Sequence, residues 1–225
     1  MTEQKRFERV RTSIKEKQQI IVKDLESYKL QLDNFNLLIV AYKDNFELDL
    51  YVKKKEETTY NKIHTYEICA LSGQLGPKRK QGDRQVPEGF YHIDRFNPTS
   101  RFYLSLGLNY PNQSDRKKSI VSDPGGDIFI HGDCVTIGCL PMTDEKIKEI
   151  YVYAIYARNN GQTKIPVYIF PFKMTHQNMN VYKEEYKDNQ GLIDFWSNLK
   201  VGYDKFTSDK KELRYSFGEN GDYTY

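Results

Sequence analysis

The spacing of apolar residues changes from helical to alternating near residue 36. Within residues 5–32, apolar side chains recur at spacings of three, four and seven, with Lys, Glu and Gln between them. This spacing predicts an amphipathic helix that packs on the main domain. Residues 46–52 alternate between apolar and polar, which is typical of a half-buried strand. The polar turn 43–45 joins them to the apolar run 37–40, so the sequence predicts a β-hairpin here.

The rest of the chain continues as strands with helices between and after them. Further strands are expected at residues 62–71, 89–95, 101–107, 127–131 and 165–172. Thr143, followed by two acidic residues, predicts a helix start, and the helical spacing runs to about Arg158. Residues 180–213 are expected to be largely helical, and the last eight residues (GENGDYTY) to be frayed. The expected fold class is therefore α+β.

Two polar segments, 72–89 and 109–126, are longer than ordinary loops, and long loops in compact domains commonly carry function. The 225 residues suffice for one substantial core. No apolar run approaches the roughly 20 residues that span a bilayer, and the N-terminus is too polar for a secretion signal. We therefore expect a protein that stays inside the cell or has already lost a signal. The net charge of +3 comes from interspersed charges, which argues against a nucleic-acid binder.

Candidate chemistry lies in the stretch DIFIHGDCVTIGCLPMTDE at residues 127–145. An apolar strand ends at His131, and Cys139 follows eight residues later. Gly132 and Gly138 allow the backbone to turn sharply between them. The chain has three cysteines, an odd number that leaves at least one thiol free. Because a thiol needs a neighbouring base to react as thiolate, one interpretation of this pattern is a Cys139 nucleophile with His131 as its base.

Two alternatives use the same residues. His131, Cys134 and Cys139 have ligand types that suit zinc, but no CxxC pair is present and the fourth ligand would have to come from elsewhere. A Cys134–Cys139 disulfide would block the nucleophile in an oxidising compartment. Cys134 is otherwise expected to be structural or incidental, and Cys69 to be a core residue.

The segment HGDCVTIGCLPMTD resembles the active-site signature of the YkuD family of L,D-transpeptidases. In that signature a His-Gly pair precedes an [S/T]-x-G-C element, here His131-Gly132 and Thr136-Ile137-Gly138-Cys139. Further motifs resemble the YafK-type subgroup of murein L,D-transpeptidase-like proteins. These motifs are GPK at 76–78, GDRQVPEGF at 82–90, FPFKMT at 170–175 and WSNLKVGYDKF at 196–206. The resemblance spans residues 37–206.

The resemblance implies a β-sandwich catalytic core and a thioester formed at Cys139 with a peptidoglycan stem peptide. A backbone carbonyl near Gly132 would orient the ring of His131, and N–H groups of Gly138 and Cys139 would stabilise the oxyanion. An amine acceptor (a second stem, a D-amino acid or a protein lysine) would make the protein a transpeptidase. Water would make it an L,D-carboxypeptidase, or an amidase that releases wall-linked protein.

The resemblance also implies a location and a division of the chain. It places the protein in the bacterial envelope, periplasmic or extracytoplasmic, with no metal, cofactor or nucleic-acid partner. The expected parts are an N-terminal helix (1–34), a catalytic domain (35–178) and a C-terminal helical extension (179–225). A non-catalytic wall-binding module of the same fold is the other class of function that fits.

Two departures from the family pattern affect the site. Ile137 stands where many members have a second histidine, so the base is assigned to His131 alone. Leu140-Pro141 follows the nucleophile where many members have an arginine that is thought to meet a substrate carboxylate. Other residues would then contact the substrate. The expected substrate-binding residues are Arg84, Asp83, Lys78, Tyr103, Arg101, Thr136 and Met142.

Overall fold

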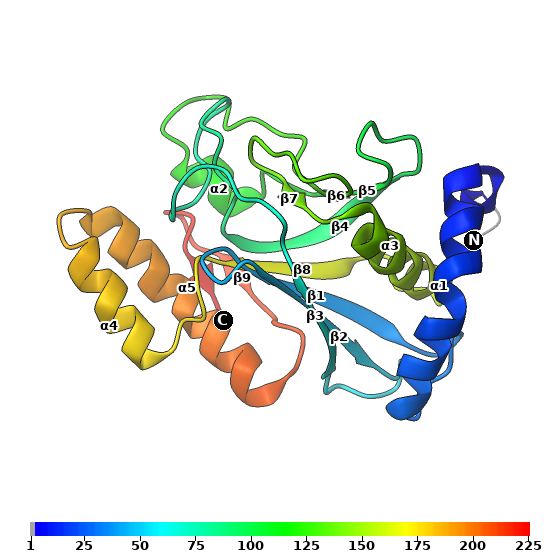
Figure 1. Ribbon diagram of the computed structural model, residues 1–225. Coiled ribbons are helices and arrows are strands. Elements are labelled where there is room, and N and C mark those ends of the chain that lie inside the picture. Colours follow the sequence, from blue (N-terminus) through cyan, green and yellow to red (C-terminus); the bar gives the residue numbers. More distant parts are fainter. Residues whose placement is uncertain (1–2) are drawn as a thin grey trace.

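The computed structural model describes residues 3–225 and confirms the mixed α+β class (Figure 1). The helices are η1 (Gln4–Arg6), α1 (Glu8–Ser27), α2 (Gln113–Lys118), α3 (Asp144–Asn159), α4 (His176–Glu185) and α5 (Gln190–Asp209). The strands are β1 (Asn36–Tyr42), β2 (Glu47–Lys53), β3 (Asn61–Glu67), β4 (Gly89–Asn97), β5 (Ser105–Leu108), β6 (Phe129–His131), β7 (Leu140–Pro141), β8 (Ile165–Phe170), β9 (Ser216–Phe217) and β10 (Tyr223–Thr224). Within residues 3–225 no helix has the length and apolar character needed to cross a membrane.

Eight of the strands form one curled sheet in the order β3-β2-β1-β8-β4-β5-β6-β7 (Figure 1). The expected hairpin is confirmed, because β1 and β2 pair antiparallel across the turn at 43–45. Strand β1 also pairs with β8 in parallel, so it lies inside the sheet. It is apolar on both faces, as an interior strand covered on each side should be.

Helices cover both faces of this sheet. The β1 residues Leu37, Ile39 and Ala41 belong to the larger apolar core, which also contains residues of α1 and α3. Leu38 and Val40 point the other way, into a second core that contains residues of α5. The C-terminal helices therefore help to bury the main sheet.

The expected N-terminal and C-terminal helices are shorter than the apolar spacing indicated. The helix expected at 5–32 is the short turn η1 followed by α1, which ends at Ser27. The helix expected at 180–213 is a pair, α4 and α5. Asn189 starts α5, since its side chain accepts a hydrogen bond from the N–H of Leu192.

The last eight residues were expected to be frayed, and that prediction is wrong. They contribute to the small two-stranded sheet β9–β10. Tyr223 is buried, its ring centroid lies 4.6 Å from that of Phe90, and its hydroxyl accepts a hydrogen bond from the Phe90 N–H. An aromatic anchor near the end of the chain holds this segment in place.

Two expectations for the middle of the chain also need correction. The segment 109–126, expected to be a loop, contains α2, which begins with a capping box between Asn112 and Asp115. The strand expected at 101–107 begins only at Ser105, because the preceding residues form a turn in which Tyr103 has a φ of +66°.

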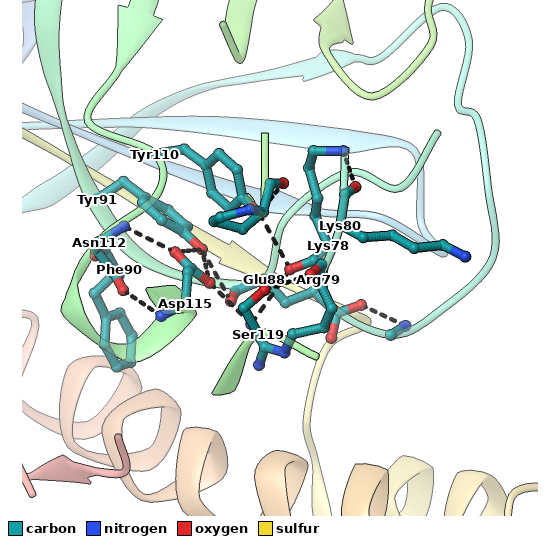
Figure 2. A network of polar contacts seen from close by, with 12 residues as sticks. Lys78, Arg79, Lys80, Glu88, Phe90, Tyr91, Tyr110, Asn112, Asp115 and Ser119 are labelled. Carbon is teal, nitrogen blue, oxygen red and sulfur yellow. Dashed lines mark hydrogen bonds and ion pairs between the residues drawn. The ribbon is translucent and has the colours of Figure 1, made fainter. Parts of the chain in front are cut away.

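Figure 2 shows the polar network that joins α2 to the loop at 72–89. The Asp115 carboxylate accepts hydrogen bonds from Arg79 at 3.0 Å and from the Tyr91 hydroxyl at 3.0 Å. Burial raises the pKa of Asp115 to about 6, although Arg79 opposes the rise. Ser119 donates a further hydrogen bond to the Arg79 carbonyl at 2.8 Å. These hydrogen bonds therefore join the loop at 72–89 to α2 and to the residue that follows it.

Candidate active site

His131 ends strand β6, and Cys139 directly precedes the adjacent strand β7. These strands pair in parallel, with Ile130 opposite Leu140. His131 follows Ile130 and Cys139 precedes Leu140, so the β6–β7 pairing holds the two residues on neighbouring segments of the backbone.

The imidazole of His131 is fixed by its own neighbour. Its Nδ1 lies 2.5 Å from the Gly132 carbonyl oxygen, which can only accept, so Nδ1 carries the proton. Nε2 is then the basic nitrogen. The ring of Phe102 lies over His131, with centroids 4.5 Å apart. Burial lowers the pKa of His131, while the hydrogen bond to Gly132 opposes this shift.

The thiol of Cys139 is half-buried and forms no disulfide in the described chain. Its Sγ lies 3.6 Å from the carbonyl oxygen of Asp127. Burial raises the pKa of Cys139, while the Phe129 N–H and the charge of Lys78 oppose the rise. Burial therefore favours the neutral form of both side chains.

Alkylation of Cys139 by iodoacetamide is therefore expected to be slow at neutral pH. Because burial raises the thiol pKa, the thiolate fraction at pH 7 falls below that of an ordinary cysteine. The rate should keep increasing with pH beyond the midpoint of free cysteine, near pH 8.5. Mass spectrometry of the protein alkylated at a series of pH values checks this. A rate plateau that begins below pH 7 would instead indicate a preformed thiolate–imidazolium pair.

The side chain of Thr136 organises the turn that presents Cys139. Its Oγ1 accepts hydrogen bonds from the N–H groups of Gly138 at 3.1 Å and Cys139 at 2.8 Å. The hydroxyl donates in turn to the Cys139 carbonyl at 2.9 Å. Thr136, expected to bind substrate, thus holds the backbone of Gly138 and Cys139 in this structure. The two N–H groups expected to stabilise the oxyanion are already engaged by it.

The loop at 72–89 lies directly against this turn through Gly138. A Cβ atom at this position would lie 3.0 Å from the Gln85 carbonyl oxygen, and the φ of Gly138 is +136°. Both the close approach and the backbone conformation require glycine. Gln85 was not singled out from the sequence, although it lies within the GDRQ motif.

Gly138→Ala is expected to lower the free energy of unfolding by about 1–3 kcal/mol and activity by at least about tenfold. The new methyl group would strain the backbone and push the turn away from Gln85. Gly161→Ala is the matched control, because Gly161 has a φ of +100° with open space around its Cβ position. It should cost stability through backbone strain but leave activity unchanged. Denaturant unfolding and activity assays on both variants check this, and equal activity losses would contradict it.

A buried ion pair fixes the same loop at its two ends. Lys43 Nζ lies 2.8 Å from Glu88 Oε1, and both side chains are almost fully buried. The same ammonium donates to the carbonyls of Gly76 and Val86. The Glu88 carboxylate also accepts from the Trp196 Nε1–H of α5 at 2.9 Å. This cluster connects the end of β1, the loop and the C-terminal helix.

A disulfide between Cys69 and Cys134 clamps the segment that joins His131 to Cys139. The expectation that Cys69 is an ordinary core residue is therefore wrong. The Cys134–Cys139 disulfide that was considered does not form, because Cys134 is already bonded to Cys69 and Cys139 remains a free thiol. Zinc binding by His131, Cys134 and Cys139 loses one of its three ligands for the same reason.

Two of the expected substrate-binding residues pair with one another. Lys78 Nζ lies 2.6 Å from Asp83 Oδ1, and both side chains are largely buried. The Asp83 carboxylate also accepts from the N–H groups of Arg79, Lys80 and Gln85. Lys78 and Asp83 therefore shape the loop beside Cys139 rather than project from it.

Tyr103 and Met142 were also expected at the substrate site, and the Met142 N–H donates to the His131 carbonyl at 2.7 Å. The Tyr103 ring is 5.5 Å from the guanidinium carbon of Arg9 and 5.6 Å from Lys148 Nζ, so it packs toward α1 and α3. Met142 is fully buried. A turn in the backbone at Tyr103 redirects its side chain, which the residue pattern alone does not show.

Arg84 and Arg101 are exposed, and each is next in sequence to a residue that contacts the site. Arg84 precedes Gln85, which contacts Gly138, and Arg101 precedes Phe102, which lies over His131. Neither guanidinium forms an ion pair with another residue of the chain between positions 3 and 225. Leu140, at the position of the family's arginine, is fully buried. Phe102 was missed in the sequence because it belongs to no motif.

Comparisons with known proteins show the family of the chain. The profile of the YkuD family, described as the L,D-transpeptidase catalytic domain, matches residues 36–169. The protein named "Putative L,D-transpeptidase YafK" of Escherichia coli (strain K12) is 41% identical over 188 residues, which make up 83% of this chain and 72% of the relative. The protein of the same name from E. coli O157:H7 gives the same values.

Two solved structures show a more distant likeness. The helical cell shape determining protein Pgp2 from Campylobacter jejuni matches with a TM-score of 0.48 and 18% identity, covering 82% of this chain and 74% of that one. Bd1075 of Bdellovibrio bacteriovorus gives a TM-score of 0.44 and 20% identity, covering 72% of this chain and 56% of that one. The family profile spans more than half of the chain, and the E. coli relatives cover most of it. The chain therefore belongs to the YkuD family of L,D-transpeptidase catalytic domains.

Proposed function

We propose that the chain is a cysteine-dependent L,D-transpeptidase that acts on peptidoglycan stem peptides, with Cys139 as nucleophile and His131 as general base. The observation that carries the proposal is the β6–β7 pairing, in which His131 ends β6 and Cys139 directly precedes β7. The Nδ1–H bond to Gly132 supports it by leaving Nε2 of His131 basic. The free thiol at Cys139 supports the role of nucleophile.

The neutral resting pair implies that the proton moves during the attack. The Cys139 thiol transfers its proton to His131 Nε2 as its sulfur bonds to the carbonyl carbon of the diamino acid at stem position three. The tetrahedral intermediate then collapses, the C–N bond breaks, and the D-residue at position four leaves as an amine with the proton from His131. The product is a thioester at Cys139. An acceptor amine resolves it by the same steps in reverse.

The oxyanion of that intermediate needs hydrogen-bond donors. The expected donors are already bonded to another acceptor in the resting state. The N–H groups of Gly138 and Cys139 both donate to Thr136 Oγ1. Their use as oxyanion donors requires that the substrate displace the Thr136 hydroxyl from at least one of them. A buried donor of this kind is typically worth about 3–4 kcal/mol of transition-state stabilisation.

For the substrate carboxylate we propose Arg84 and Arg101. They are exposed, they are next in sequence to the residues that contact Gly138 and His131, and they form no ion pair with a carboxylate of the described residues. Arginine suits this task because its planar guanidinium binds a carboxylate through two parallel hydrogen bonds. Lys78 lacks this freedom, because its ammonium is held by Asp83.

We place the protein in the bacterial envelope, in the periplasm or outside the cytoplasmic membrane. Family membership implies a peptidoglycan substrate, and the Cys69–Cys134 disulfide is typical of oxidising compartments. The division into a helix (1–34), a catalytic domain (35–178) and an extension (179–225) is also part of the proposal. The hydrogen bond from Trp196 to Glu88 suggests that the extension supports the catalytic loop.

Mass spectrometry of muropeptide tetrapeptides, incubated with the protein and a D-amino acid, tests the reaction. Exchanged or dimerised stems are expected. Tripeptides alone would assign the protein to the L,D-carboxypeptidases, with water as acceptor. Protein pretreated with iodoacetamide is the control and should give no product. If tetrapeptides and protein-linked stems both remain unchanged, a non-catalytic wall-binding module of this fold replaces the proposal.

A further inference from the structure

Three side chains with metal-binding atoms meet outside the Cys139–His131 pair. They are Asp24 of α1, His64 of β3 and Glu149 of α3. His64 Nε2 lies 2.8 Å from Asp24 Oδ2 and 3.8 Å from Glu149 Oε1. The three candidate ligand atoms all lie within 4.8 Å of one another. One imidazole and two carboxylates thus converge from three elements that are far apart in sequence.

The backbone of β3 is irregular next to His64. Leu50 of β2 is opposite His64, whereas the adjacent Tyr51 is opposite Lys62, so β3 carries the extra residue Ile63. Such bulges commonly re-aim side chains at functional positions.

Two tyrosines hold the carboxylate oxygens of this cluster. The Tyr66 hydroxyl donates to Glu149 Oε1, and the Tyr153 hydroxyl donates to Asp24 Oδ2 at 3.3 Å. Hydrogen bonds of this kind orient the ligands of metal sites, and removing them typically costs 10–100-fold in metal affinity.

The cluster has more negative than positive charge. Within residues 3–225, no Lys or Arg forms an ion pair with Asp24 or Glu149. Two carboxylates therefore face a single imidazole, and even a protonated His64 would leave one negative charge. The side chains of Asp24, His64 and Glu149 are only 26%, 27% and 13% exposed, so water screens this charge incompletely while still reaching the site.

We propose that Asp24, His64 and Glu149 bind a divalent transition-metal ion, with zinc as the best fit. Imidazole and carboxylate ligands suit zinc, whereas calcium and magnesium prefer oxygen alone. Neighbouring ligands of tetrahedral zinc lie roughly 3.4 Å apart, and the two separations from His64, 2.8 and 3.8 Å, fall on either side of this value. Water completes the coordination. The ion would clip α1 and α3 to the edge strand β3.

Isothermal titration with Zn²⁺ tests the site in a Cys139→Ala background, which removes the competing thiol. We expect one ion per chain, and at least a tenfold weaker affinity in Cys139→Ala/Glu149→Gln. Glu149→Gln preserves the side-chain shape and the acceptor for Tyr66. His176→Asn, at an exposed histidine of α4, is the matched control and should leave the affinity unchanged.

Thermal unfolding provides the second measurement. Zn²⁺ should raise the Tm of Cys139→Ala and of its His176→Asn derivative, but not that of Cys139→Ala/Glu149→Gln. Binding that Glu149→Gln leaves intact would overturn the proposal. So would the lack of any binding up to about 1 mM Zn²⁺, in which case His64 is only an ion-pair partner of the two carboxylates.

Discussion

Replacing Cys139 by alanine is expected to abolish turnover, with a fall in kcat of at least about 10⁴-fold. The sulfur atom of Cys139 forms the proposed thioester, and Cys139 is the free cysteine among the described residues. Its Sγ contacts the Asp127 carbonyl only weakly, at 3.6 Å, so the free energy of unfolding should change by less than about 1 kcal/mol. Steady-state kinetics on muropeptides and denaturant unfolding measure the two effects separately.

The matched control is the double variant Cys69→Ser/Cys134→Ser. It removes the two other cysteines and keeps the nucleophile. Loss of the disulfide should cost roughly 2–4 kcal/mol of stability, while turnover stays within about tenfold of the unchanged protein at temperatures where it remains folded. The single variants are less suitable, because each leaves a second free thiol near Cys139. If both variants lost turnover equally, the nucleophile assignment would be wrong.

The local parts of this site could be predicted from the sequence. An apolar strand ending at His131 and a glycine-rich turn before Cys139 are short-range features, and β6, the turn and β7 follow that order. The hairpin of β1 and β2 and the cap of α3 at Thr143 were predictable for the same reason. In each case neighbouring residues determine the conformation.

The features that were missed depend on contacts between distant segments. The disulfide joins Cys69 and Cys134 across 65 residues, and spacing alone does not determine such connectivity. Tyr223 is anchored by Phe90, 133 residues away, so a polar C-terminal segment became a strand. Lys78 looked available to substrate because the pattern does not show that its ammonium is bound by Asp83. The residues that surround Cys139 therefore had to be found in the folded chain.

Loss of the Glu88 carboxylate is expected to have the largest effect on stability. Glu88→Ala would leave the buried Lys43 ammonium without its counter-charge and remove the acceptor for Gly76 N–H and Trp196 Nε1–H. Unpairing a buried charge of this kind typically costs about 3–5 kcal/mol. Activity should fall as well, because the same cluster holds Val86 beside the residue that contacts Gly138. Denaturant unfolding at neutral pH measures the stability change.

Two further variants test whether the loss of stability comes from the unpaired buried charge or from a fold that any substitution would destabilise. Lys200→Ala breaks an i,i+4 ion pair with Asp204, whose side chain is 53% exposed, and should cost less than about 1 kcal/mol. Lys43→Met/Glu88→Leu removes both buried charges and should be clearly more stable than Glu88→Ala, because no unpaired charge remains. If the double variant were instead destabilised by the sum of its two single changes, the ion pair would not be the cause. The hydrogen bonds from Gly76 and Trp196 to Glu88 would then be what holds the catalytic loop to α5.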